Sequence, residues 1–141
     1  MEVIYYYDKK LENCPVKKYF QKYLANKNDS DSSLKRKEKI LVNIDQKINY
    51  VRENNGRPTP PISKPLHGYS FFEILNSKDS KTLIRILYFR HLEKIVLLHA
   101  FEKPASYHTN RENKIVEKQN LIAEKYLNNF KLNPEIYEKY Q

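Results

Sequence analysis

A single run of apolar residues constrains the fold of this chain more than any other feature. The run KIVLLHAF, from Lys94 to Phe101, is apolar almost throughout. This pattern is typical of a strand in the middle of a layered structure with both faces covered, because a strand with one wet face alternates apolar with polar residues. The sequence therefore predicts a sheet that carries further elements on each side.

Three other segments have the composition of strands. Tyr69–Leu75 and Thr82–Phe89 precede the apolar run, and the linkers NSKDSK and RHLE are short enough to join all three strands as an antiparallel meander. Glu2–Tyr7 is rich in Val, Ile and Tyr and is followed by a polar segment, so it is predicted to be an opening strand.

Helical periodicity occupies the stretch between the first strand and the meander. Pro15 is suited to the first turn of a short helix, and the turn-forming segment Asn26–Ser33 separates this helix from a longer one with a basic face. These two helices are predicted to form a helical hairpin. Asn54–Pro65 contains a glycine and four prolines, so it is expected to be an extended connector.

A third helix is predicted near the C-terminus. Thr109 followed by Glu112 matches the capping box, in which the two side chains satisfy free backbone N–H groups at a helix start. The predicted class is therefore α+β, in the order β-α-α-β-β-β-α, with one domain over residues 1–132. Asn133-Pro134 interrupts the helical pattern, so residues 133–141 are expected to be a frayed tail or a short docking helix.

Charge points to a polyanionic partner. The chain has 26 Lys+Arg against 17 Asp+Glu, a formal charge of +9, which suits nucleic acid, an acidic protein or an anionic membrane surface. No apolar run approaches the ~20 residues of a membrane span, and the N-terminus does not resemble a signal peptide. Cys14 is the only cysteine, which fits a reducing cytoplasm.

Several classes of site are excluded by residue type. A single cysteine cannot build a Cys-based zinc site, and no histidine pair has convincing metal-ligand spacing, so no metal is expected. With only two glycines, the phosphate-cradling loops of nucleotide enzymes are also excluded, and no cofactor is expected.

The predicted sheet region itself is basic. Between Arg57 and Arg111 there are nine Lys/Arg and four acidic residues, a net charge of +5. Four of these cations are candidates for contacts to a polyanion such as nucleic acid: Lys64, Lys81, Arg90 and Arg111.

Arg85 stands in the middle of a predicted strand. Alternation places Arg85, Leu87 and Phe89 on one face, and an arginine there is costly to bury unless it is paired or faces a wet concavity. Two interpretations are equally open: a structural ion pair with Glu73 on the neighbouring strand, or a phosphate ligand.

The segment after the apolar strand collects groups that bind phosphate or move protons: Lys103, Tyr107 and His108. Such groups are often placed on loops that a rigid sheet holds. His99, inside the apolar run, is better explained as a hydrogen-bonded core histidine, whereas His67 and His91 are expected at the surface.

Taken in order, several segments resemble the HigB-like, phage-derived branch of the RelE/ParE toxin superfamily. The resemblance runs from about Met1 to Phe130 and is carried by EVIYYYDKKLENCPVKKYFQKYL, KPLHGYSFFEI, RILYF, VLLHAFEK and the helix start NREN. It implies a RelE-like fold, namely a small twisted antiparallel sheet with an N-terminal helical hairpin and a C-terminal helix. It also implies a ribosome-dependent mRNA endonuclease whose partners are the ribosome, mRNA and an acidic helix-turn-helix antitoxin.

The resemblance assigns roles to individual residues. Arg85 and Lys103 match family cations, so Arg85 would bind the scissile phosphate and Lys103 would stabilise the transition state, while His108 or Tyr107 would move the proton. Glu73 matches the glutamate of the family's strand motif.

The chain also departs from the family pattern. Leu75 and Pro104 replace two cations, and the pair His108-Thr109 replaces a Thr-Pro pair. These losses keep two alternatives open: a non-catalytic ParE-like toxin that inhibits a protein target such as DNA gyrase, or a degenerate RNA-binding protein.

Overall fold

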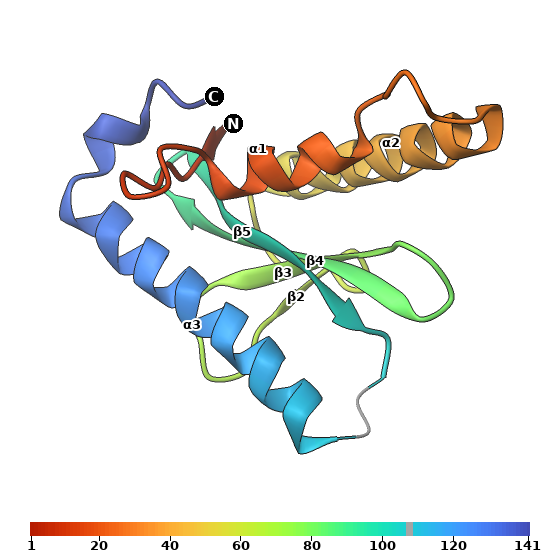
Figure 1. Cartoon of the computed structure of the whole chain (residues 1–141). Coiled ribbons are helices and arrows are strands. Elements are labelled where there is room, and N and C mark those ends of the chain that lie inside the picture. The colour runs from red at the N-terminus through yellow and green to blue at the C-terminus, as the bar shows by residue number, and fades with distance from the viewer. Residues whose placement is uncertain (107–108) are drawn as a thin grey trace.

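A twisted five-stranded sheet with helices on both faces forms the protein (Figure 1). In this computed structural model, residues 1–106 and 109–141 are described. The two N-terminal helices lie on one face of the sheet and the long C-terminal helix crosses the other, and the chain ends lie close together (Figure 1). The α+β class predicted from the sequence is confirmed.

The strands follow the predicted pattern with one addition. They are β1 (Glu2–Tyr5), β2 (Ser63–Pro65), β3 (Phe72–Ser77), β4 (Thr82–His91) and β5 (Lys94–Pro104). The extra strand, β2, is the end of the proline-rich connector, and it pairs with β3 at the edge of the sheet. Proline is tolerated there because an edge strand does not need every N–H for the ladder.

The sheet is mixed, in the order β1-β5-β4-β3-β2. The short linkers correctly predict antiparallel pairing among β3, β4 and β5. The expectation of an antiparallel sheet throughout is wrong, because β1 pairs with β5 in parallel. About 90 residues separate these two strands in the chain, and a connection of that length leaves either direction sterically accessible.

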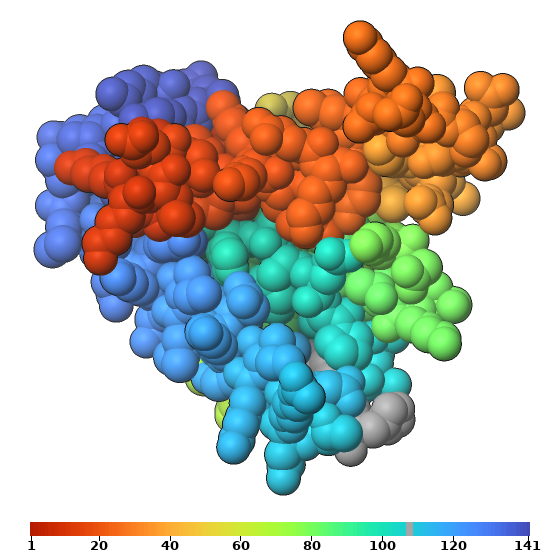
Figure 2. All heavy atoms as spheres, in the orientation of Figure 1, coloured from red at the N-terminus to blue at the C-terminus, as the bar shows by residue number. Residues whose placement is uncertain are grey.

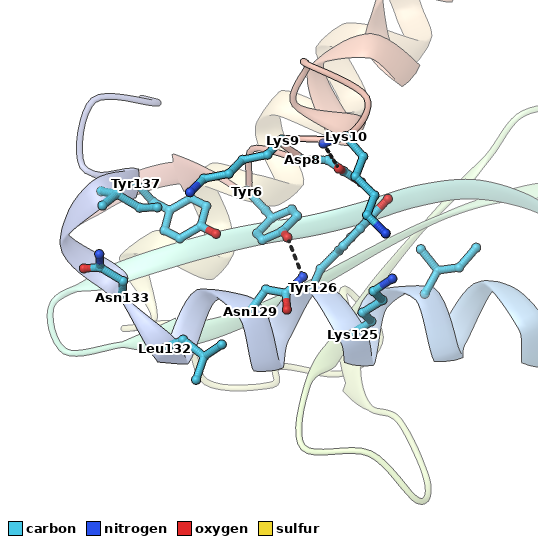
Figure 3. Close-up of a pocket in the computed structure, with 12 residues that line it drawn as sticks. Tyr6, Asp8, Lys9, Lys10, Lys125, Tyr126, Asn129, Leu132, Asn133 and Tyr137 are labelled. Atoms are coloured by element: carbon cyan, nitrogen blue, oxygen red, sulfur yellow. Dashed lines mark hydrogen bonds between the residues drawn. The ribbon is translucent and has the colours of Figure 1, made fainter.

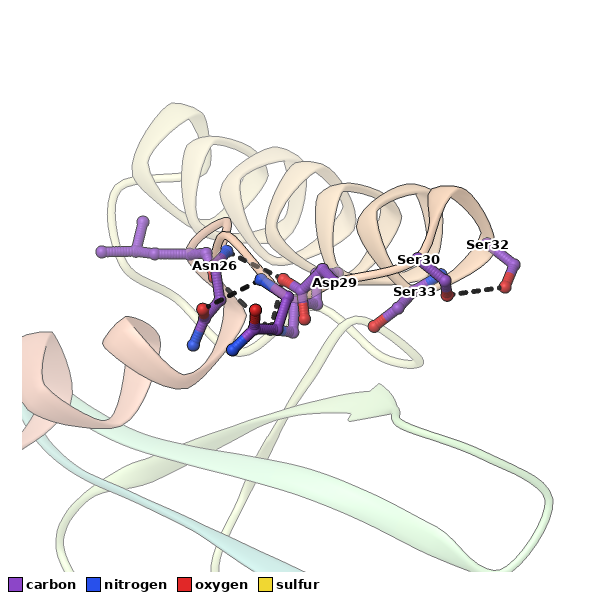
Figure 4. A network of polar contacts seen from close by, with 8 residues as sticks. Asn26, Asp29, Ser30, Ser32 and Ser33 are labelled. Carbon is purple, nitrogen blue, oxygen red and sulfur yellow. Dashed lines mark hydrogen bonds and ion pairs between the residues drawn. The ribbon is translucent and has the colours of Figure 1, made fainter.

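The helices begin at recognisable caps. They are α1 (Pro15–Phe20), the 3-10 turn η1 (Gln21–Tyr23), α2 (Asp31–Glu53), α3 (Asn110–Leu132) and the 3-10 turn η2 (Pro134–Tyr137). Ser30 caps α2 by accepting a hydrogen bond from the Ser33 N–H at 3.2 Å, next to a turn in which the Asp29 carboxylate accepts from the Asn26 N–H (Figure 4). The predicted cap of α3 is confirmed for Thr109, whose hydroxyl accepts from the Glu112 N–H at 3.1 Å. The Glu112 carboxylate accepts from the Thr109 hydroxyl at 3.1 Å, in place of the backbone N–H that a full capping box requires.

Each face of the sheet has its own apolar core. Ile84, Ile86 and Tyr88 of β4 pack toward α1 and α2, whereas Leu87 and Phe89 pack toward α3. We call these two sides the α1–α2 face and the α3 face. The alternation predicted for β4 is therefore confirmed, and the coverage of β5 on both sides agrees with its apolar composition.

A β-bulge interrupts the pairing of β4 with β5. The partner of Leu87 is His99, but the partner of the next residue, Tyr88, is Leu97. Leu98 and His99 consequently both point to the α3 face, where Leu98 joins the core and His99 contacts Gln119 of α3. This extra residue is what directs His99 toward the helix.

The C-terminal segment is docked against the start of the chain. Tyr137 in η2 is buried, Tyr140 stacks on Tyr7 with ring centroids 4.6 Å apart, and the Tyr5 N–H donates to the Tyr140 carbonyl at 2.7 Å. In Figure 2 the N-terminal loop (red) lies directly beside this segment (blue). Of the two alternatives for residues 133–141, the structure has the docked helix. Over residues 1–106 and 109–141, no helix combines the length and the apolar character that crossing a membrane requires.

Candidate functional site

Three charged residues on adjacent strands form a diagonal across the α3 face. Lys103 of β5 lies opposite Leu83 of β4, whereas Arg85 is two residues further along β4. Glu73 of β3 is displaced from Arg85 in the same way, since its partner is Leu87. Side chains in such diagonal positions are about 7–8 Å apart at their Cα atoms and can interact when they are long.

Arg85 is buried and paired. It is only 5% exposed, its Nε lies 2.6 Å from a Glu73 carboxylate oxygen, and its Nη1 donates to the Asn120 side chain of α3 at 3.2 Å. The guanidinium also lies 5.8 Å from the Phe101 ring centroid. The structural ion pair, one of the two interpretations left open by the sequence, is therefore present.

The ion pair has unusual geometry. The Arg85 Nε and the Glu73 carboxylate oxygen are close. Neither atom, however, forms a hydrogen bond of acceptable geometry with any described residue. The contact is thus chiefly ionic. A guanidinium carries five N–H donors, so the contacts with Glu73 and Asn120 leave donors for another acceptor.

A hollow of about 470 Å³ opens over Arg85. It lies between the N-terminal half of α3 and the sheet, and its lining comprises Arg85, Leu66, Asn113, Lys114, Glu117 and Asn120, with Val116. Glu117 accepts a short hydrogen bond from the Tyr69 hydroxyl, and burial together with this carboxylate raises the pKa of Tyr69 to about 12. A guanidinium, a carboxylate and two amides therefore share one concavity, a set that can bind an anion and exchange a proton with it.

Two predicted cations lie at the adjoining end of the sheet. Lys103 is half-buried on β5, and exposed Lys81 is in the turn between β3 and β4. The Lys81 carbonyl accepts from the Ala105 N–H at 2.9 Å, so this turn lies beside the end of β5. Lys64 and Arg111 are also exposed. Lys64 lies on β2, opposite Glu73 of β3, and Arg111 lies in the first turn of α3.

Arg90 is not part of this group. It lies at the other end of β4, nine residues from Lys81, which corresponds to about 30 Å along a strand. Its guanidinium donates to the carbonyls of Leu92 and Asn55 at 2.8 and 3.2 Å and pairs with Glu93 at 3.3 Å. These contacts hold the β4–β5 turn against the loop after α2, so the structure gives Arg90 a structural role.

Two predicted proton-transfer residues, Tyr107 and His108, lie outside the described residues. The other histidines are described. Burial lowers the pKa of His99, whose Nε2 is 2.7 Å from the Gln119 oxygen, as expected for a hydrogen-bonded core histidine. His67 is exposed as expected, but His91 is half-buried, with its ring 5.2 Å from that of Phe130. Within the described ranges, no three His, Cys, Asp or Glu side chains come together as metal ligands.

The two positions at which the sequence departs from the resemblance, Leu75 and Pro104, lie beside the diagonal. Leu75 is directly opposite Arg85 on β3 and therefore on the α3 face, and Pro104 follows Lys103. A cation at position 75 would face the Arg85 guanidinium. Leucine at this position is uncharged, and Glu73 neutralises Arg85.

Sequence reasoning missed a second charged cluster, on the α1–α2 face. Glu102 pairs with Lys78 and, at 3.6 Å, with Lys22, close to the hydrogen-bonded hydroxyls of Tyr19 and Tyr23. Alternation along β5 could have placed Glu102 on the face opposite Lys103. The partners, Lys22 in η1 and Lys78 in the β3–β4 turn, carry no sequence signal of their proximity.

Comparisons with protein-family models, with curated proteins and with solved structures each find no match.

Proposed function

We propose that the chain is the toxin of a type II toxin–antitoxin system in the RelE/ParE superfamily, and that it cleaves mRNA on the ribosome. The observation that carries the proposal is the diagonal of Lys103 and Arg85 on the α3 face, next to a hollow that also contains a carboxylate. The position of α1 and α2 on one face of the sheet and of α3 on the other supports the proposal (Figure 1).

The reaction requires few chemical groups from the protein. The 2′-hydroxyl of the RNA attacks the adjacent phosphorus, the 5′-oxygen leaves in line, and a cyclic phosphate remains on the upstream fragment. The nucleophile belongs to the substrate, so no cofactor or metal is required. The protein contributes positioning, cations for the charged phosphorane, and proton transfer at the two oxygens.

Arg85 and Lys103 take the two cationic roles. Arg85 binds the scissile phosphate with guanidinium donors that remain beyond Glu73 and Asn120, and Glu73 holds its orientation. Lys103, a diagonal neighbour, stabilises the phosphorane charge. His108 or Tyr107 transfers the proton, and Lys64, Lys81 and Arg111 contact the RNA backbone around the hollow. The cognate antitoxin is an acidic helix-turn-helix protein that holds the toxin inactive, and the free toxin acts in the cytoplasm, where the ribosomes are.

The decisive experiment maps mRNA 5′ ends in a reconstituted translation reaction. We compare wild type with Lys103→Ala and use Lys94→Ala as the matched control, because Lys94 lies at the other end of β5 and pairs with Glu138. We expect new 5′ ends that require ribosomes. Lys103→Ala should slow cleavage by about 100-fold or more, the range seen when one transition-state donor is removed, and Lys94→Ala should stay within about threefold.

A second candidate is a non-catalytic ParE-like toxin. It is favoured by the burial of Arg85 in an ion pair and by Leu75 opposite it, since both reduce the positive charge available to a phosphate. In that case no new 5′ ends arise while expression still arrests growth, and supercoiling by DNA gyrase is the next assay. If neither cleavage nor arrest occurs, a degenerate RNA-binding protein is the remaining reading.

A further inference from the structure

Two hollows of the molecule combine cations with a carboxylate. The hollow over Arg85 contains Glu117. Another, of about 460 Å³, lies between the loop after β1, the C-terminal half of α3 and η2, with Asp8 in its lining (Figure 3). We call it the lysine-lined hollow, because three lysines belong to it: Lys9, Lys10 and Lys125. In both hollows the carboxylate offsets part of the positive charge that an anion would meet.

A third hollow, of about 430 Å³, has no carboxylate among the described residues that line it. It lies at the end of the sheet away from Lys103, where the loop after α2, the start of β3, the end of β4 and the last turn of α3 meet. Its basic residues are Arg57, Arg90 and Lys131, which are exposed, and His91, which is half-buried. We call it the Arg57–Arg90 hollow. Its volume lies in the range of small-molecule sites, about 300–1,000 Å³.

Arg90 is oriented by its contacts but keeps its charge. Its guanidinium donates to the carbonyls of Leu92 and Asn55, which fix the group without neutralising it. Its carboxylate partner, Glu93, has a side chain that is 83% exposed, and water weakens such an ion pair. These contacts occupy three of the five N–H donors of the guanidinium, so donors remain for a ligand.

Gly56 places the second arginine beside the first. It has φ +75°, and a Cβ built there would lie 3.3 Å from the Cβ of Arg90, so the loop after α2 lies directly against that side chain. Arg57, the next residue, lines the same hollow. Two guanidinium groups favour a ligand with several acceptor oxygens, because each planar fork can bind two of them. A phosphate monoester, with about two negative charges and three acceptor oxygens near neutral pH, meets this requirement better than a carboxylate does.

The other wall of the Arg57–Arg90 hollow is apolar. It consists of Pro58 and Phe72, which are half-buried, and of Phe89, which is buried. Inorganic phosphate has no group to place against these side chains, whereas the organic part of a phosphate ester does. Small-molecule sites commonly combine such an apolar wall with a few polar groups that fix the orientation of the ligand.

We propose that the Arg57–Arg90 hollow binds a phosphate monoester, with the phosphate held by Arg57, Arg90 and Lys131 and the organic group lying against Pro58 and Phe72. Two sources present this chemistry, a free nucleoside monophosphate and the 5′-terminal phosphate of an RNA chain. The site does not depend on the proposed nuclease function. Attack by an internal 2′-hydroxyl leaves a cyclic phosphate and a 5′-hydroxyl, and neither product end is a phosphate monoester.

The test titrates the full-length protein with AMP, inorganic phosphate and adenosine at low ionic strength, followed by isothermal titration calorimetry. We expect AMP to bind at least tenfold more tightly than either of the other two. Arg57→Ala and Lys131→Ala should each weaken AMP binding at least tenfold. The matched controls are Arg52→Ala and Lys35→Ala on α2, which remove the same charges at exposed positions outside the hollow and should change AMP binding less than twofold. Because all four residues are exposed, the variants should keep the fold, which circular dichroism checks.

A second titration identifies the source of the phosphate. It uses a short oligoribonucleotide that carries either a 5′-phosphate or a 5′-hydroxyl. A 5′-phosphate that strengthens binding to the wild type but not to Arg57→Ala assigns the hollow to RNA ends. AMP binding with no effect of the 5′-phosphate on the oligoribonucleotide assigns it to free nucleotides.

Three results would overturn the proposal. The first is that neither AMP nor the 5′-phosphorylated oligoribonucleotide binds at millimolar concentration. The second is that AMP binds no more tightly than adenosine or inorganic phosphate. The third is that Arg57→Ala and Arg52→Ala weaken binding equally, which would reduce the effect to the overall charge of the protein. None of these titrations measures mRNA cleavage, so failure here is distinguishable from failure of the nuclease proposal.

Discussion

At the scale of single residues, the burial of Arg85 matters most, because it bears on both the stability of the fold and the proposed catalysis. A guanidinium in a nearly closed site costs free energy unless it is paired, and Glu73 and Asn120 provide the partners. In the proposed mechanism the same contacts orient the Arg85 guanidinium for a phosphate. Its structural and its proposed catalytic role therefore depend on one environment and must be separated by measuring stability alongside activity.

Removing the partner of Arg85 should be strongly destabilising. Glu73→Ala leaves a buried cation without its counter-ion, and we expect a loss of about 3–5 kcal/mol in the free energy of unfolding. The double variant Glu73→Leu/Arg85→Met should recover most of that loss, because it removes both charges. Urea denaturation measures both variants. A double variant as unstable as Glu73→Ala would contradict this explanation.

His99 should make stability depend on pH. Burial lowers its pKa in the folded state below the unfolded value of about 6.5, so below that pH the unfolded chain binds more protons. Stability should then fall as the pH drops from 7 to 5, by at most about 1.4 kcal/mol per pH unit from this group. His99→Gln, which cannot titrate, should show a shallower slope in urea denaturation. Equal slopes would show that His99 does not control this window.

At the scale of secondary-structure elements, the end of α2 depends on one glycine. Gly56 has φ +75°, and its N–H donates to the Val51 carbonyl at 2.9 Å. A Cβ built there would lie 3.3 Å from the Cβ of Arg90, the residue that ties the β4–β5 turn to this loop. The helix end and the hairpin turn are therefore coupled through Gly56.

A matched pair of glycine variants tests this coupling. Gly68 has φ +84° but open space around its Cβ position, so Gly68→Ala should cost only backbone strain, about 1–2 kcal/mol. Gly56→Ala carries similar strain and must in addition displace Arg90. We expect its midpoint in thermal unfolding to fall clearly further. Equal midpoints for the two variants would mean that the contact with Arg90 relaxes without cost.

Local signals determined how well the elements could be predicted. The Thr109 cap of α3 and the alternation on β4 depend on neighbouring residues, and both are confirmed. β2 has only three residues and ends in proline, so it carries no strand pattern. The parallel pairing of β1 and the bulge at Leu98 depend on contacts between distant segments, which periodicity does not encode.

The candidate site was predictable in part for the same reason. Alternation and the hypothesis of an ion pair placed Arg85 and Glu73 correctly, since both residues lie on neighbouring strands of one meander. The contributions of Asn120 and Glu117 were not predicted, because the sequence does not fix which side of α3 covers the sheet at this point. In the sequence nothing distinguishes Arg90 from the other cations. The structure separates it from them, because it lies at the far end of β4.

At the scale of the whole molecule, the chain ends complete the core on the α3 face. Tyr137 is 4% exposed, and its ring lies 4.9 Å from Phe130 and 5.3 Å from Tyr6. The last residues thus join β1 and α3 and also form one wall of the lysine-lined hollow. Loss of this segment should affect global stability as well as that surface.

Tyr137→Ala should therefore destabilise the entire fold. Truncation of a buried aromatic side chain costs about 3–5 kcal/mol, and we expect that loss in the free energy of unfolding followed by circular dichroism. Tyr140→Ala is the control, because Tyr140 is half-buried and its ring stacks on Tyr7 at the rim of the core. A smaller effect for Tyr137 than for Tyr140 would show that η2 docks only weakly.

The proposed site is tested most directly by lysine footprinting. The acetylation rate of each lysine is measured by mass spectrometry with and without a single-stranded oligoribonucleotide at low ionic strength, where phosphate contacts are strongest. We expect protection of Lys103, Lys81 and Lys64, around the hollow over Arg85, and unchanged rates at Lys35 and Lys94. Unchanged acetylation of Lys103 while RNA is bound would place the RNA elsewhere and contradict the proposed site.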